Sequence, residues 1–127
     1  MRDLIISVTC LLCLMVPWGI YDRYSMSTIE NYKTLIDSRI LPAIETNDWP
    51  AAEKEMKFIA QNWDDYKSVS AYFTDTTSIN EVDSMVSKVY YYVKCRDASN
   101  SAGEIASLKY CLNFLHENQH PSLKNIF

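Results

Sequence analysis

From Trp49 to Phe73, apolar or small residues recur at steps of three and four positions along the chain. Polar residues fill most positions between them, so one face of a helix would be apolar and the other solvated. A strand would need alternation at every second residue. The spacing therefore predicts an amphipathic helix over 49–73, with Asp48 as N-cap and Pro50 in its first turn. The series is Trp49, Ala52, Met56, Ile59, Trp63, Tyr66, Ser70 and Phe73.

Three further segments repeat this spacing, and each opens with a serine followed three residues later by a glutamate. This arrangement is typical of a capping box, so it predicts helices that begin at Ser27, Ser78 and Ser101. The first helix is expected to run to about Thr46, with a kink or an early end at Pro42. The apolar faces are Ile29, Tyr32, Ile36, Ile40 and Ala43; then Ile79, Val82, Val86, Val89, Val93 and Arg96; then Ile105, Leu108, Leu112 and Leu115.

The turns between these helices are short, which makes consecutive helices antiparallel neighbours. Folding the chain about each turn places Tyr32, Trp63, Val89 and Leu108 in one central layer. We therefore predict an all-α fold, in which an N-terminal transmembrane helix is followed by an up-down-up-down four-helix bundle. The bulky apolar residues at positions 126 and 127 are expected to fold back onto that bundle, since they would otherwise face water.

Residues 4–21 carry no charged side chain, and a run of this length is near the lower limit for crossing a bilayer. Trp18 and Tyr21 lie at its far end, where aromatic rings favour the headgroup zone. We predict a retained signal-anchor over residues 1–24 and a helical bundle domain over 25–127. The alternatives are a cleaved signal peptide, which would end in small residues that are missing here, and a buried core helix.

The first bundle helix either begins at Ser27 or continues the membrane helix outward, because nothing between Gly19 and Ser27 forces a break. Arg2 and the α-amino group precede the apolar run, and this positive charge favours an N-terminus inside the cell. We therefore expect a single-pass protein of the cell membrane, with lipid contact through residues 4–21 and the bulk of the chain outside the cytoplasm.

The composition narrows the classes of function. The net charge is −4 and lysine and arginine form no run, so binding to nucleic acid is not expected. Mild acidity also disfavours electrostatic capture by anionic headgroups, which leaves an inserted segment as the means of attachment. The two glycines are too few for a loop that cradles phosphate groups.

Residues 116–120 read H-E-x-x-H, the spacing with which a helix presents two zinc ligands and a general base. His116 and His120 would bind the metal and Glu117 would activate its water, so a zinc-dependent peptidase is a remote alternative. A catalytic zinc needs a third protein ligand, and residues 121–127 offer no histidine, cysteine or acid. Pro121 also disfavours helical geometry at His120. We therefore expect no metal site, no cofactor and no enzymatic activity.

The four cysteines do not form a metal or redox pattern. Cys10 and Cys13 lie inside the apolar run, where thiols pack as small apolar groups. Cys95 and Cys111 fall about nine residues out of register in the last hairpin, so no disulfide is expected between them. At least one ring of the tyrosines at 90–92 should be partly exposed, either as helix packing or as part of a face that binds a partner.

Several short motifs give the chain a resemblance to a known family. They are Asn47-Asp48-Trp49 with Ala52, Tyr92-Val93-Lys94-Cys95, Ile105-Ala106-Ser107-Leu108-Lys109 and Asn125-Ile126-Phe127. With the apolar start, they resemble the bacterial domain-of-unknown-function family 4363, whose members look like short, membrane-anchored, all-helical proteins. Members often carry a histidine beside an acidic pair before the third bundle helix, and residues 76–83 here contain none. The resemblance implies a fold and no activity.

These observations favour a structural or protein-interaction module, displayed on the extracytoplasmic face and bound to an unidentified protein partner. The alternative is a sensor-like bundle that holds a small ligand between its helices. That hypothesis predicts a pocket near Arg96, Tyr66 and Ser70, the polar residues that lie on the apolar faces.

Overall fold

A computed structural model describes residues 1–119, except for the side chains of residues 118 and 119. Every regular element in this part of the chain is a helix, which confirms the predicted all-α fold. The expected position of the apolar residues at 126 and 127 lies outside the described residues. The elements are α1 (Arg2–Leu35), the π-helical turn η1 (Ile36–Ile40), α2 (Leu41–Glu45), α3 (Trp49–Ser70), α4 (Thr76–Lys94) and α5 (Ala98–Gln119).

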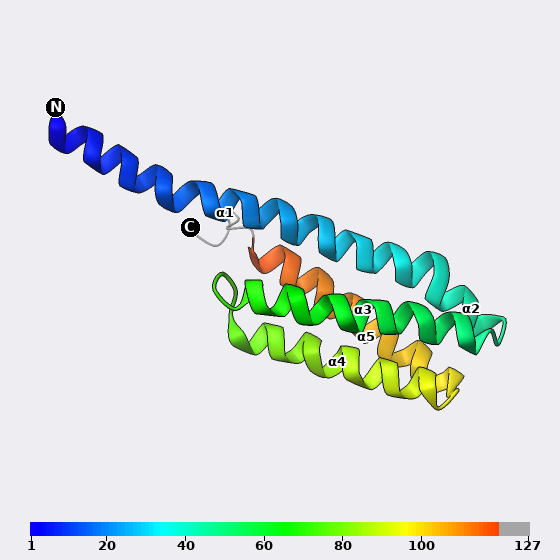
Figure 1. The fold of residues 1–127 in the computed structure, drawn as a ribbon. Coiled ribbons are helices and arrows are strands. Elements are labelled where there is room, and N and C mark those ends of the chain that lie inside the picture. The colour runs from blue at the N-terminus through cyan, green and yellow to red at the C-terminus, as the bar shows by residue number, and fades with distance from the viewer. Residues whose placement is uncertain (120–127) are drawn as a thin grey trace.

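The helices pack as an antiparallel bundle that lies beside the second half of α1. Figure 1 shows the first half of α1 projecting beyond the other helices, while α3 and α4 run side by side in opposite directions. Helix α5 packs against α4, α1 and α2, and α3 packs against α1, η1 and α2. The expected four-helix bundle is therefore present, and its first helix is the continuation of the N-terminal helix.

The prediction of a helix N-terminus at Ser27 is wrong, because α1 passes through this position without a break. The backbone N–H groups here already bond within the helix, so none is left for a serine cap. Glu30, the other half of the expected capping box, instead pairs with Lys33 at 3.0 Å. Of the two alternatives for this region, the continuous helix is the one observed.

The predicted early end of the helix at Pro42 is wrong, because the helix continues to Glu45. The chain widens into a π-helical turn directly before Pro42, and the N–H of Leu41 reaches back to the carbonyl of Ile36. Proline cannot donate the next helical hydrogen bond, and one wider turn absorbs the mismatch without a separate break. The helix then ends at Glu45, and Asn47 turns the chain in the left-handed region with φ 58°.

Aspartates, and not serines, cap the last three helices. The predicted cap Asp48 accepts the N–H of Ala51 at 3.4 Å, but α4 begins at Thr76, two residues before its predicted serine, and α5 begins at Ala98, three residues before its own. Asp75 accepts the N–H of Ser78 at 3.1 Å, and Asp97 accepts that of Asn100 at the same distance. A carboxylate gains from the positive end of the helix dipole, which a serine hydroxyl does not.

The core follows the predicted apolar faces, with two corrections. Arg96 is exposed with φ 58°, because the chain turns there instead of continuing the face of α4. Helix α3 ends at Ser70, so Phe73 belongs to the following turn. The buried apolar residues are Tyr21, Ile29, Tyr32, Ile36, Ile40, Ala43, Ile44, Trp49, Ala52, Met56, Ile59, Trp63, Tyr66, Ile79, Val82, Val86, Val89, Val93, Ile105, Leu108, Leu112 and Leu115.

The residues expected to form one central layer, Tyr32, Trp63, Val89 and Leu108, are all buried in this core. The axial position of Leu108 on α5, however, differs from the predicted layer. Lys109 pairs with Asp37 at 2.6 Å, which places the Leu108 turn beside η1 and about one turn beyond Tyr32. The short turns gave the antiparallel order, but side-chain packing sets the final axial offset.

Truncation of Trp63 tests whether the face of α3 is the centre of the core. The side chain is almost fully buried, so we expect Trp63→Ala to lower the free energy of unfolding by about 3–5 kcal/mol through the cavity it leaves. Urea unfolding of the full chain in mild detergent, followed by circular dichroism, measures this loss. The half-exposed Phe58→Ala on the same helix should lose about 1 kcal/mol or less. Equal losses would contradict the assignment.

A pair of substitutions distinguishes the aspartate cap of α4 from the serine cap that the sequence pattern indicated. Asp75→Ala removes the acceptor for the Ser78 N–H and should cost about 1 kcal/mol. Ser78→Ala leaves that bond in place and should cost less than about 0.5 kcal/mol. The same unfolding assay applies, and a larger loss for Ser78→Ala would restore the serine as the cap.

Candidate functional site

The most connected polar cluster in the described chain lies where α1 leaves the bundle. Tyr21 is only 5% exposed, although it ends the uncharged N-terminal run. Its hydroxyl donates to the Ser70 hydroxyl at 2.9 Å and lies 3.0 Å from the Thr74 hydroxyl. Its ring stacks on Phe73 with centroids 4.3 Å apart. Tyr21 therefore joins the first helix to the end of α3 and to the turn that follows it.

A second contact, one turn further along α1, repeats this arrangement. The hydroxyls of Ser25 and Tyr66 lie 2.6 Å apart in the buried interior. The ring of Tyr66 contacts Trp63 at 5.2 Å and Tyr24 at 5.9 Å between centroids. Buried hydroxyls need partners, and these two contacts satisfy theirs across the α1–α3 boundary. Together they hold α1 against α3 at one angle and one height; we call these residues, Tyr21, Ser25, Tyr66, Ser70 and Thr74, the junction.

The sequence reading missed the junction. Tyr21 falls within the predicted membrane run, and Ser25 lies on none of the predicted apolar faces. A signal was present, because Tyr21, Ser25, Ile29 and Tyr32 follow at steps of four, four and three residues. This spacing continues the buried face of α1 toward its N-terminus. A tyrosine and a serine are not strongly apolar, so their identity alone does not predict a core position.

The predicted ligand pocket does not form. Tyr66 and Ser70 take part in the junction, while Arg96 is exposed at the turn between α4 and α5. The serine hydroxyl accepts a hydrogen bond within the core instead of facing a cavity. The three residues shared the helical period on the sequence, but they belong to opposite ends of the bundle.

Tyr32 and Ser101 are the buried side chains whose hydroxyls have no hydrogen-bond partner within the described part of the chain. Of the two, Tyr32 borders a surface hollow. Burial raises the pKa of this phenol well above its usual value, and the nearby Tyr24, Tyr66 and Asp65 add to the effect. The ring forms part of a surface hollow of about 200 Å³, whose other walls are Tyr24, Thr28, Asn31, Phe58, Asn62 and Asp65.

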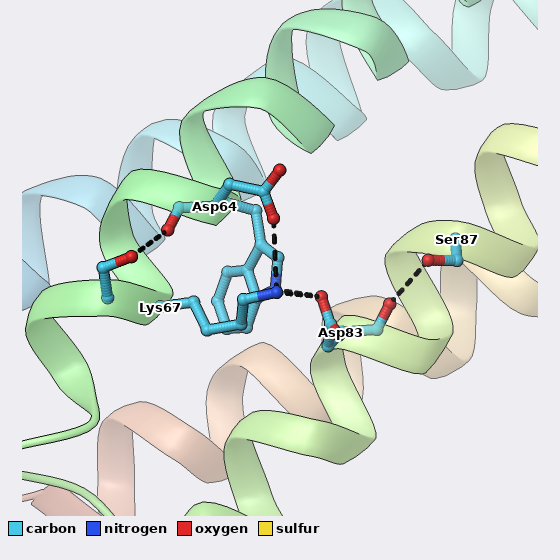
Figure 2. A network of polar contacts seen from close by, with 6 residues as sticks. Asp64, Lys67, Asp83 and Ser87 are labelled. Carbon is cyan, nitrogen blue, oxygen red and sulfur yellow. Dashed lines mark hydrogen bonds and ion pairs between the residues drawn. The ribbon is translucent and has the colours of Figure 1, made fainter.

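An ion-pair cluster joins α3 to α4 on the opposite face of α3. The indole N–H of Trp63 donates to Asp83 at 3.0 Å, which gives the buried ring its polar partner. Figure 2 shows Lys67 between Asp64 and Asp83, at 3.3 and 3.2 Å, with the Ser87 hydroxyl bonded to the Asp83 carbonyl. The bond to Asp83 and the one to Asp64 raise the pKa of Lys67.

This cluster borders a groove of about 350 Å³ between α3 and α4. Tyr90 and Tyr91 lie along it, and Tyr91 is 64% exposed. The expectation that one ring of 90–92 would be partly exposed is confirmed. Because Lys67 pairs with both aspartates, the cluster links α3 to α4 and offers no free nucleophile or base among its described residues. Its aromatic edge is the part suited to contact with another protein.

Comparison with protein families matches residues 22–126 to the family described as Domain of unknown function (DUF4363). The chain belongs to this family. The match covers the bundle and starts directly after the uncharged run, at the residue next to Tyr21. Neither the curated proteins nor the solved structures searched include a match to the chain. The description of the DUF4363 family names no activity.

Ahead of the family match, α1 carries a stretch that is long and apolar enough to span a membrane. Its mean hydropathy is 2.1, and the bundle covers only 6% of that window. A core helix would be largely covered, so packing inside this chain does not account for the apolar run.

The remaining chemical candidates stay apart in this DUF4363 member. The cysteines at 10, 13, 95 and 111 are free thiols, three of them exposed and Cys111 half-buried. His116 is half-buried near the end of α5, and Glu117 is exposed. His120 lies outside the described residues, so the H-E-x-x-H hypothesis is not tested. Within residues 1–119, no three histidine, cysteine or acidic side chains gather closely enough to hold a metal ion.

Replacement of Tyr32 by phenylalanine tests the unpartnered hydroxyl. Removing a buried group without a partner should raise the free energy of unfolding at pH 7 by about 1 kcal/mol. The unfolded phenol releases its proton near pH 10, whereas the folded one holds it, so stability falls as pH rises above about 10. Tyr32→Phe should flatten this alkaline fall.

Urea unfolding at pH 7 and pH 11 measures both effects. Tyr110→Phe, at an exposed position on α5, is the matched control and should leave both values unchanged. A loss of stability in Tyr32→Phe at pH 7 would mean that the hydroxyl has a favourable partner.

Proposed function

We propose that this chain is a single-pass membrane protein, which holds its bundle close to the extracytoplasmic surface and acts there through protein contacts. The observation that carries the proposal is the continuity of α1. One helix starts with exposed apolar residues and ends in the core of the bundle. The α-helix satisfies its own backbone groups, which is the requirement for crossing lipid.

The exposed surface of the first half of α1 supports the anchor. A soluble monomer rarely leaves so continuous an apolar surface in water, since each residue loses the free energy of burial. A bilayer would cover all sides of the helix at once. The exposed large apolar residues of this half are Leu4, Ile5, Ile6, Val8, Leu11, Leu12, Leu14, Met15, Val16, Trp18 and Ile20.

The junction supports a fixed placement of the bundle. A flexible linker would let the domain move away from the lipid, whereas Tyr21 and Ser25 tie α3 to the helix within a turn of the uncharged run. A domain held in this way presents a constant face outward. We expect that face to bind protein through exposed aromatic residues such as Tyr91, beside the α3–α4 groove.

A structural or interaction role is favoured over catalysis. The charged cluster of Lys67, Asp64 and Asp83 neutralises itself and braces two helices. The hydrogen bonds to both carboxylates raise the pKa of Lys67, which keeps its ammonium group protonated and so unavailable as a general base. Elemental analysis of the purified full chain tests the remote zinc-peptidase alternative, which stoichiometric zinc would revive.

A ligand-binding bundle is the second candidate, and it now depends on the hollow beside Tyr32 instead of the residues first expected. The unpartnered hydroxyl and the side chains of Asn31 and Asn62 offer hydrogen bonds there. Native mass spectrometry of the chain purified from its membrane tests this candidate. A stoichiometric small-molecule adduct that Tyr32→Phe or Asn62→Ala removes would support it, and its absence would count against it.

A single charge in the apolar run tests the anchor. Leu11→Arg should make insertion less favourable by about 2.5–3.5 kcal/mol, because a charged side chain would have to enter the hydrocarbon. We expect the variant to shift from the carbonate-resistant membrane fraction toward the soluble fraction. Met26→Arg, at an exposed position on the same helix but beyond the run, should remain in the membrane. Equal extraction of both variants and the parent protein would contradict an inserted helix.

Protease treatment of intact cells, compared with lysed spheroplasts, determines the side on which the bundle lies. An extracytoplasmic bundle should be cut in intact cells, and protection until lysis would reverse the proposed orientation.

A photo-crosslinking residue at Tyr91, compared with one at Tyr110 on α5, then tests the protein-contact face. Crosslinks at the first position alone would support the α3–α4 groove as that face.

A further inference from the structure

The turn between α3 and α4 lies beside the end of the uncharged run, at the same position along the axis of α1. Tyr21 holds Ser70 and Thr74 by hydrogen bonds on either side of this turn. Figure 1 shows the turn on the side of the bundle from which α1 projects. Residues 71–73 are therefore close to the membrane segment in space, although about fifty residues separate them along the chain.

The first three residues of this turn, 71–73, are exposed, and all of them are aromatic or apolar. Tyr72 is 86% exposed and Phe73 is 39% exposed, while Val69 is half-exposed at the end of α3. A surface turn usually carries polar residues, because aromatic rings gain from leaving water. The turn continues into an apolar groove of about 610 Å³ against α1, lined by Pro17, Ile20, Tyr21, Tyr24, Val69 and Phe73.

The length of the uncharged run sets the depth of the turn. At 1.5 Å per residue, residues 4–21 span about 27 Å, close to the roughly 30 Å of a hydrocarbon core. If Leu4 lies at one boundary, Tyr21 lies at the other. The rings of Trp18, Tyr24 and Tyr72 then fall within the headgroup zone, which aromatic side chains with a polar edge prefer.

We propose that the α3–α4 turn, residues 71–73, inserts into the headgroup region of the same bilayer as a second point of membrane contact. This inference rests on the proposed anchor and names a further lipid-binding segment of the bundle itself. The occupant of the groove is lipid, because the groove is continuous with the lipid-facing side of α1 at Pro17 and Ile20. Contacts at both α1 and the turn fix the tilt of the bundle against the surface.

The charges near the turn do not select a lipid headgroup. Asp22, Arg23 and Asp75 flank it with mixed sign, so attraction to anionic lipid contributes little. Insertion is driven by the aromatic and apolar surface. Vesicles of uncharged phosphatidylcholine therefore suffice for the test.

Site-directed fluorescence in such vesicles tests the inference on the full chain. The four cysteines are first replaced by alanine. Single cysteines are then introduced at Tyr72 or at Tyr110 on α5, which is 70% exposed, or the cysteine at position 13 is restored. Each is labelled with the same environment-sensitive dye. Nitroxide groups on the lipid chain, shallow or deep, report lipid contact, and iodide reports exposure to water.

The dye on Tyr72→Cys should be quenched by the shallow nitroxide about twofold or more strongly than the dye on Tyr110→Cys, with the opposite order for iodide. Equal iodide quenching at both sites would overturn the inference. Protection from iodide without nitroxide quenching would also overturn it, because a second copy or residues 120–127 would then cover the turn.

The dye at Cys13 separates this inference from the anchor. Deep-nitroxide quenching at position 13 without shallow quenching at position 72 would leave the anchor standing and reject the inserted turn. Absence of quenching at position 13 would reject the anchor, and with it the inference. Quenching at both positions in uncharged vesicles supports both.

Discussion

The unbroken hydrogen bonding of α1 carries the chain from an exposed half into the bundle, and it fixes where the bundle begins. In its first half the side chains point outward on every side, and in its second half one face enters the core. A helix suits both surroundings, because its backbone groups bond within the segment and need neither water nor a neighbouring strand. No loop is then needed at the boundary, and the bundle starts where the uncharged run ends.

The junction turns this continuity into a fixed geometry. A helix alone would set the direction of the chain but would leave the bundle free to pack at several heights along α1. The hydroxyl contacts of Tyr21 and Ser25 with α3 select one of these heights. Hydrogen bonds have directional geometry that apolar contacts lack, so they specify a register where the apolar face of α1 becomes sparse. As a consequence, the aromatic turn after α3 lies beside Tyr21, at the end of the uncharged run.

Much of the architecture was accessible from apolar periodicity, because a buried face must repeat with the turn of the helix. The face of α3 from Trp49 to Ser70 is buried at every predicted position. Helix starts were less accessible, since Ser78 and Ser101 fit a capping box as well as Asp75 and Asp97 fit a cap three and four residues earlier. Both patterns satisfy the same local rule, and only the whole helix decides which residue precedes its first turn.

By itself, the sequence determined the helical class, the uncharged run and the faces that meet in the core, because each follows from local composition and a short period. The tertiary structure alone decided which polar residues meet. It brought Tyr21 to Ser70 and Thr74, separated Arg96 from Tyr66, and stacked Phe73 on Tyr21 at the end of the apolar run. Such pairs lie far apart along the chain, and their contact depends on the axial offset between helices, which no local pattern encodes.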